Sequence, residues 1–250
     1  MPHSTQSDAA ASRKDNWFTT TQWSFVLEAR DPNSPQAFQA LETLCRTYWH
    51  PLYAFARSLG HDEETAKDLI QGFFARLLER HSLRSADPEK GKFRSFLLTG
   101  LRNFLSDEWD RARAQKRGGG TVFISLDDEN AEERFRVEPT DDMSPDRLFD
   151  RHWALTVLDQ AAERLREEYE KAGQIALFEQ LRGFLSGKMG GGCYAETASC
   201  LELPENTLKS LVHRLRHRYR ERLREVIADT VATPAEVDEE IRHLLDALAA

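Results

Sequence analysis

Apolar side chains recur at spacings of three and four residues through most of this chain, which is the pattern of amphipathic α-helices. Residues 62–80 give the clearest case, with apolar side chains at Ala66, Leu69, Ile70, Phe73, Phe74, Leu77 and Leu78. No stretch of alternating polar and apolar residues is long enough to form a sheet. The spacing therefore predicts an all-α protein in which the helices bury each other's apolar faces.

The same spacing predicts further helices and where they begin and end. One stripe covers residues 38–48, is broken at Pro51 and resumes over residues 52–59, and another long face covers residues 93–105. Asp62 is expected to cap the helix over residues 62–80, and Ser144 with Pro145 is expected to start a helix that reaches Gly173. The helices fall into two modules, which are separated by residues 118–144, an acidic linker with little periodicity.

Charged residues fall in blocks of opposite sign, although the formal net charge of the 250 residues is only -8. Residues 90–117 and 209–224 are basic, whereas residues 127–150 are acidic. Two basic blocks separated by an acidic one indicate two modules that bind polyanions. For either block taken alone, a solvated charged helix face is the alternative interpretation.

Several classes of protein are excluded by what the sequence lacks. It has no run of about 18 uncharged apolar residues and no apolar segment of a signal peptide near its start, so we expect a cytoplasmic protein without membrane insertion. Three cysteines are too few for a disulfide framework. No phosphate loop, nucleophile elbow or metal-binding pair at helical spacing occurs, so we expect neither enzymatic activity nor a cofactor.

Residues 194–224 have the pattern of a helix-turn-helix. A short helix over residues 194–201 is followed by a turn at residues 202–204 and by a longer helix with a basic far end. Outward residues in the first turns of the second helix are candidates for reading base edges in the major groove, namely Glu205, Asn206, Thr207, Lys209, Ser210, His213 and Arg214. Arg216 and Arg218 lie further along and are better suited to phosphates.

Two other interpretations of this segment remain. An ordinary helical hairpin with a solvated basic face would show the same periodicity. Cys193, Cys200, His213 and His217 also approach the spacing of a zinc finger, but the first gap is too wide and its residues predict a helix. We therefore expect no metal site, with His213 on the surface and Cys200 as a small buried residue.

The helix over residues 93–105 and its continuation interleave aromatic and basic residues, as single-stranded nucleic acid requires. Phe93, Phe96 and Phe104 fall on the apolar stripe, so Trp109 is the aromatic residue expected to be available for stacking. The helix over residues 62–80 carries Asp68 and Gln71 beside an unusually apolar surface, which would also suit a protein partner.

Three motifs in this order resemble bacterial RNA polymerase sigma factors of the sigma-70 superfamily, extracytoplasmic-function (ECF) type. YAFARSLGHDEETAKDLIQGFFARLLE (53–79) is similar to regions 2.1 and 2.2, and GKFRSFLLTGLRNFLSDEWDRARAQKR (91–117) is similar to regions 2.3 and 2.4. YAETASCLELPENTLKSLVHRLRHRYRERL (194–223) resembles region 4.2. The resemblance implies an N-terminal extension (1–34), a region 2-like domain (35–117), the acidic linker (118–144), a region 4-like domain (145–230) and an acidic C-terminal helix or tail (231–250).

The resemblance also implies partners and roles. Core RNA polymerase, through its clamp helices and flap, and promoter DNA are the implied partners, with an anti-sigma factor or other regulator as a further candidate. Positions that dock on the clamp helices are matched by Asp68, Leu69, Gln71 and Phe74. Positions that melt and capture the -10 element are matched by Lys92, Arg94, Ser95, Phe96, Arg102, Asn103, Trp109, Arg111 and Arg113. The helix that reads the -35 element is matched by residues 205–214.

Two positions depart from the pattern of region 4.2, and the tail lies outside it. Glu202 stands at the corner where glycine is usual, which costs roughly 1 kcal/mol if the residue is left-handed. Pro204 stands where a serine or threonine cap is usual, so the start of the second helix is expected to differ from the usual pattern by about one position. The tail over residues 233–250 predicts an acidic amphipathic helix that would cover a basic face or bind a partner.

The function expected from these observations is promoter selection for core RNA polymerase. A stand-alone helix-turn-helix regulator, with the first bundle as a dimerisation or sensor module, is the alternative. A helical adaptor without a role on DNA is the third interpretation.

Overall fold

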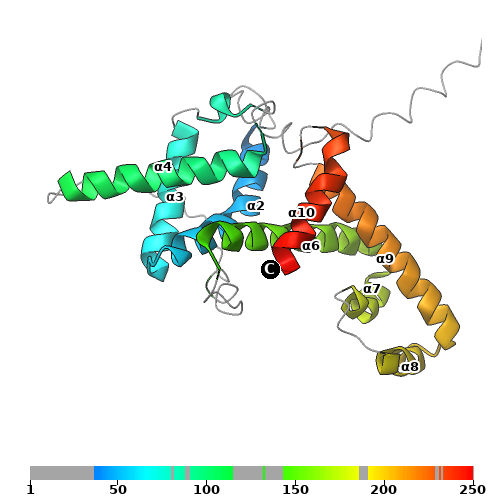
Figure 1. Ribbon diagram of the computed structural model, residues 1–250. Helices are drawn as coiled ribbons and strands as arrows, with labels where there is room; N and C mark the ends of the chain where they lie inside the picture. The colour runs from blue at the N-terminus through cyan, green and yellow to red at the C-terminus, as the bar shows by residue number, and fades with distance from the viewer. Residues whose placement is uncertain are drawn as a thin grey trace, which may run out of the picture.

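The computed structural model describes residues 37–79, 82–87, 91–114, 132, 143–185, 191–228, 231 and 233–249. Within these ranges no strand occurs, which confirms the all-α prediction. The helices, shown in Figure 1, are α2 (Ala37–Ser58), α3 (Glu63–Glu79), η1 (Ser82–Ser85), α4 (Phe93–Ala114), α6 (Pro145–Lys171), α7 (Ile175–Leu181), η3 (Arg182–Phe184), α8 (Gly191–Cys200), α9 (Glu205–Ala228), η4 (Pro234–Glu236) and α10 (Val237–Ala249). The N-terminal extension and most of the acidic linker lie outside the described residues.

Helices α2, α3 and α4 pack around aromatic side chains. Tyr48 meets Phe93 edge-on at a centroid distance of 5.5 Å, and Phe73 meets Phe104 at 5.9 Å. Gly72 of α3 permits this close approach, because a Cβ atom there would lie 3.2 Å from the Phe104 ring. Each fully buried large apolar side chain contributes about 1.5–3 kcal/mol, so this cluster is a major stabilising element of the first bundle.

The predicted break at Pro51 is wrong, because α2 continues through it to Ser58. A proline inside a helix removes one hydrogen bond and costs about 3 kcal/mol. Tyr48 before it and Leu52 and Tyr53 after it are all fully buried, so packing on both sides offsets that cost. Tertiary contacts therefore decide the length of this helix.

The long helices α6 and α9 join two hydrophobic clusters. The first half of α6 and the end of α9 share the cluster of α2, α3 and α4, to which they contribute Phe149, Trp153 and Val226. The second half of α6 packs with α7, η3, α8 and the start of α9 in a second cluster. The two helices therefore run in opposite directions, and Figure 1 shows α4 and the start of α9 far apart on the molecule. The division into a region 2-like and a region 4-like domain stays a prediction.

Two predicted helix starts agree with the structure. Asp62 accepts a hydrogen bond from the backbone nitrogen of Thr65 at 2.9 Å, so it caps α3 as expected. This hydrogen bond, and a second one that the hydroxyl of Thr65 donates at 2.8 Å, hold the pKa of Asp62 below its usual 3.8. Ser144 caps α6, with Pro145 in the first turn as expected.

The turn between α8 and α9 has the left-handed corner that the sequence comparison with region 4.2 suggested. Glu202 has a φ of 52°, and the backbone nitrogen of Leu203 donates to the carbonyl of Ala198 at 2.9 Å. This is the hydrogen-bond pattern of a Schellman motif, which usually has glycine at the left-handed position. Gly173 has a φ of 69° in the same pattern after α6.

The C-terminal segment forms the expected amphipathic helix, α10, which packs on α6 and α9 (Figure 1). Val237 and Leu244 are buried in the core, whereas Leu245 is exposed. Its first turn carries Asp238, Glu239 and Glu240.

Candidate nucleic-acid interface

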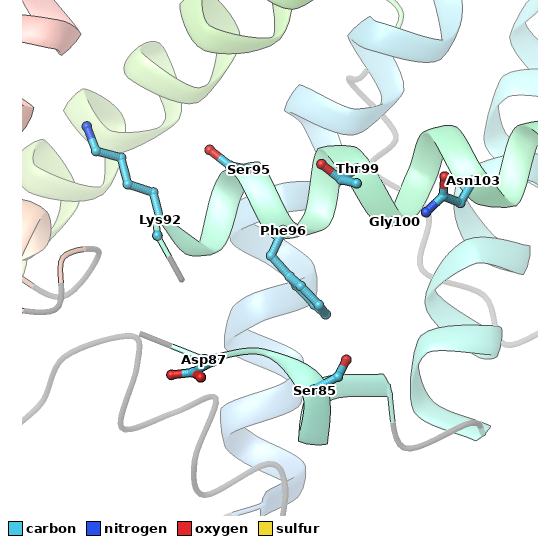
Figure 2. A pocket seen from close by; sticks show the side chains of 9 residues that line it. Ser85, Asp87, Lys92, Ser95, Phe96, Thr99, Gly100 and Asn103 are labelled. Carbon is cyan, nitrogen blue, oxygen red and sulfur yellow. The ribbon is translucent and has the colours of Figure 1, made fainter. Parts of the chain in front are cut away.

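A hollow of about 310 Å³ lies between the start of α4 and the segment that follows η1. Figure 2 shows the ring of Phe96 pointing from α4 towards Ser85. The lining residues are Ser85, Asp87, Gly91, Lys92, Ser95, Phe96, Thr99, Gly100 and Asn103. Its volume is at the lower end of the range for pockets that hold small organic groups. It offers one aromatic face together with hydroxyl and amide groups that donate and accept hydrogen bonds.

The structure brings four of the residues expected at the -10 element to this hollow, namely Lys92, Ser95, Phe96 and Asn103. These residues are close because successive turns of a helix place every third or fourth residue on the same face. Sequence analysis missed Thr99, although it stands at the same spacing. It also missed Ser85 and Asp87, which reach the hollow only through the fold of the segment before α4.

Trp109 is the large exposed aromatic side chain of α4, with 66% of its surface accessible, as the sequence predicted. It lies more than three turns beyond Phe96 on the same helix. Arg111 is also exposed and is paired with Glu108 at 2.5 Å. Arg113 belongs to α4, but its side chain lies outside the described residues.

Arg94 does not occupy the surface position expected for it. Only 6% of the residue is exposed, and its guanidinium lies 4.3 Å from the centroid of the Trp153 ring. Burial lowers the pKa of Arg94. The alternation of charge and apolar residues at the start of α4 gives no sign that an arginine here faces the core.

Two cations of α4, and Lys92 immediately before it, are paired with carboxylates from the C-terminal half of the chain. Lys92 and Arg94 both contact the carboxylate of Glu240 in α10, and Arg102 pairs with Asp146 of α6. Burial also lowers the pKa of Lys92. These partners lie far away in the sequence, so no local pattern could have identified them.

The outward face of α9 agrees with the orientation predicted for it. Glu205, Asn206, Thr207, Lys209, Ser210, His213 and Arg214 are all exposed, whereas Leu208, Val212 and Leu215 are buried. Lys209, Ser210, His213 and Arg214 line a shallow hollow on this face. The helix therefore presents donors and acceptors of the kind that contact base edges and phosphates.

Farther along α9, the two arginines expected at phosphates differ from each other. Arg216 is half-buried and donates from Nε to the carbonyl of Phe184 at 3.0 Å, so it holds α9 against η3. Arg218 is exposed and lies 3.5 Å from Glu168. The expected phosphate contacts of Arg216 and Arg218 stay a prediction.

The zinc alternative gains no support among the described residues, where no group of histidine, cysteine and carboxylate side chains could hold a metal ion. Cys200 is exposed, so the expectation that it is buried is wrong. Ala198 is the buried α8 residue of the second cluster, and a residue two positions away on a helix lies on a nearly opposite face. The side chain of Cys193 lies outside the described residues.

The face of α3 expected to dock on polymerase is only partly a surface. Asp68 is exposed and Leu69 and Gln71 are half-buried. Phe74 is 2% exposed and its ring stacks on Trp49 at a centroid distance of 6.2 Å. The expected surface position is therefore wrong for Phe74, whose side chain supports α3 from the core.

Glu132 belongs to the acidic linker, and it is the residue that the structure describes between positions 115 and 142. Its side chain contacts α2. Its carboxylate accepts hydrogen bonds from Tyr53 at 2.5 Å and from two nitrogens of Arg57 at 2.9 and 2.8 Å. Burial and the neighbouring carboxylate raise the pKa of Tyr53, and the hydrogen bond to Glu132 raises the pKa of Arg57. The linker is thus anchored to the first bundle at this point.

Among the helices that the structure describes, none is long and apolar enough to cross a membrane.

Residues 44–115 match the family model described as Sigma-70 region 2. The matched segment includes α3, α4 and the hollow beside Phe96, and covers well under half of the chain. No curated protein and no solved structure matches the chain. The match supports a sigma-70 family relationship and a role in transcription initiation.

Proposed function

We propose that this chain is a sigma factor of the ECF type. In this role it binds core RNA polymerase, recognises the -10 and -35 promoter elements and directs the start of DNA-templated transcription. It acts in the cytoplasm, performs no covalent chemistry and needs no cofactor. An anti-sigma factor or other regulator is a candidate further partner.

The observation that carries the proposal is the hollow beside Phe96 within the segment that matches Sigma-70 region 2. A base extruded from the DNA stack needs an aromatic face and hydrogen-bonding groups at its edge. Phe96 supplies the face, and Ser95, Thr99 and Asn103 supply hydroxyl and amide groups. Stacking contributes about 1–3 kcal/mol per base, which offsets much of the cost of unpairing.

The second module supports recognition of a duplex element. The exposed first turns of α9 carry Lys209, Ser210, His213 and Arg214 on one face, as a recognition helix in the major groove requires. Arg218 and other exposed arginines farther along suit the phosphate backbone. Upstream promoter choice is therefore assigned to α9.

Contact with the polymerase is assigned to the exposed part of α3. Asp68 and Gln71 lie one turn apart on this helix, beside the half-buried Leu69. A polar pair beside apolar surface suits a protein partner. Phe74 contributes by holding the helix in position.

A stand-alone helix-turn-helix regulator is the second candidate, because α8 and α9 alone would serve a protein that binds duplex DNA without polymerase. Co-purification with core RNA polymerase separates the two. A sigma factor is retained by the polymerase and selects promoter fragments only in its presence, whereas a regulator binds a duplex operator by itself.

The variant that tests the polymerase surface is Asp68→Ala combined with Gln71→Ala. Weaker retention by core polymerase is expected, with little change in thermal stability, because Asp68 is exposed and Gln71 is only half-buried. Glu64→Ala is the matched control, since it removes one exposed carboxylate from the same helix. Equal retention of all three proteins would refute the assignment of this surface.

Trp109→Ala tests the single-strand surface of α4. We expect its affinity for single-stranded DNA to fall about 5- to 100-fold, the equivalent of one lost stacking contact. Leu59→Ala is the control, because it also removes an exposed apolar side chain from the first bundle. The measurement is fluorescence anisotropy of a labelled single strand, and an equal effect of both substitutions would contradict a stacking role.

A further inference from the structure

The carboxylate of Glu240 is buried at the start of α4. None of its side chain is exposed, and it pairs with Lys92 at 2.5 Å and with Arg94. A buried carboxylate is costly unless cations and hydrogen bonds compensate it, so the two cations and Glu240 depend on one another. Lys92 also lines the hollow beside Phe96.

Helix α6 adds two further carboxylates to the same side of α4. Asp150 lies 3.5 Å from Arg94, and Asp146 pairs with the exposed Arg102. Carboxylates thus occupy three of the cations expected to meet the -10 element. These three carboxylates contact the cations as the phosphates of a nucleic-acid backbone would.

Helix α10 is attached to the rest of the molecule mainly by its contacts with α6 and α9. Leu244 is fully buried, Asp238 pairs with Arg224 at 2.6 Å, and Arg151 donates to the carbonyl of Leu248 at 3.2 Å. An isolated helix of 13 residues is marginal in water, so the order of α10 depends on this docking. Its link to α4 through Glu240 is ionic, and an ionic link can be exchanged for another anion.

We propose that α10 is a built-in competitor of nucleic acid, in which Glu240 occupies Lys92 beside the hollow as a phosphate would, so that DNA must displace α10 to reach this cation. The inference rests on the proposed function, because it concerns the same surface of α4. With α10 docked, the protein is in a closed state, in which the chain without polymerase binds single-stranded promoter DNA weakly. Opening of α10 exposes Lys92, which lines the hollow, and removes Glu240 from Arg94, which keeps its contacts with Trp153 and Asp150 of α6.

The first test uses Glu240→Gln in the full-length chain, which removes the charge and preserves the shape of the side chain. Asp246→Asn is the matched control, because Asp246 lies on the same helix and is exposed. The probe is a fluorescein-labelled single-stranded oligonucleotide of mixed sequence, titrated at several salt concentrations. Thermal unfolding of each protein is measured in parallel to establish that the variants are folded.

Glu240→Gln is expected to bind the probe at least about tenfold more tightly than the wild type, because a closed state populated above about 90% lowers apparent affinity by that factor. One freed cation, Lys92, should also steepen the slope of log K against log salt by about 0.7, the contribution of one phosphate contact on a single strand. Asp246→Asn is expected to leave the slope unchanged.

The second test needs no substitution. Hydrogen exchange of the wild type is followed with and without a saturating amount of the probe, and the amides of α10 are expected to exchange faster when DNA is bound. The buried amides of α2 serve as the internal control. Equal salt slopes for wild type and Glu240→Gln, or α10 amides that remain equally protected with DNA bound, would overturn the competition while leaving the proposed function intact. If no form of the chain binds the probe, alone or with core polymerase, the proposed function fails and the competition fails with it.

Discussion

Glu202→Gly is expected to stabilise the protein, and Gly173→Ala is expected to destabilise it by a similar amount. Both residues follow a helix and close a Schellman motif, with φ values of 52° and 69°. A residue with a Cβ atom pays about 1–2 kcal/mol in this left-handed region. Glycine avoids that cost but loses about 0.5–1 kcal/mol more backbone entropy on folding.

The net effect is therefore about 0.5–1 kcal/mol at each position, with opposite signs. No atom lies within 4 Å of a Cβ atom added to Gly173, so the cost there comes from the backbone alone. Glu202 is exposed, so removing its side chain leaves no cavity. For a single cooperative unit of this length, each substitution should move the melting temperature by about 1–4 °C.

The assay is thermal and denaturant unfolding followed by circular dichroism, with coincident transitions as the check on two-state behaviour. Glu202→Ala is the control, because it removes the carboxylate and keeps the Cβ atom. It should give little of the stabilisation seen with glycine. If alanine stabilises as much as glycine, the effect belongs to the charge of Glu202 and the reasoning from backbone conformation is refuted.

Three further predictions concern single side chains. Glu132→Ala should lower the free energy of unfolding by about 2–3 kcal/mol in denaturant titrations, because it leaves the half-buried Arg57 without its carboxylate partner. The control Glu42→Ala breaks an exposed ion pair and should cost under about 0.5 kcal/mol. Equal costs would contradict docking of the linker. Iodoacetamide should label the exposed Cys200 in the native protein and spare Cys45, since burial raises the pKa of the Cys45 thiol to about 11. Peptide mass spectrometry measures the order of labelling, and faster labelling of Cys45 would contradict its burial. The pKa of the Asp62 carboxylate is lowered in the folded protein, so its charge stabilises the fold above the unfolded pKa. This contribution is lost as the pH falls through the folded pKa, so the difference in unfolding free energy between wild type and Asp62→Asn should shrink on acidification. A difference that does not depend on pH would count against the cap.

Much of the helical layout could be predicted, because helix periodicity and capping are local properties. The stripe over residues 62–80 and the caps at Asp62 and Ser144 each depend on neighbours within four residues. The corner at Glu202 could be predicted from the resemblance, since a helix-turn-helix needs a left-handed residue there. The continuation of α2 through Pro51 could not, because distant side chains stabilise it.

The types of residue in the candidate site could be predicted from the sequence, but whether each side chain is exposed or buried could be predicted only in part. Trp109 and the outward face of α9 follow directly from helical spacing. Phe74 and Arg94 are buried by packing against Trp49 and Trp153, which the local pattern does not reveal. Charge blocks identify cations but not their partners, so the pairing with Glu240 emerges only in the folded chain.

Mapping the 5′ ends of transcripts made by purified core RNA polymerase, with and without this chain, tests the central claim most directly. The account predicts new, discrete start sites that require the chain, and a change in which promoters are used when Lys209 or Arg214 is replaced by alanine. Start sites that are identical with and without the chain would contradict the account.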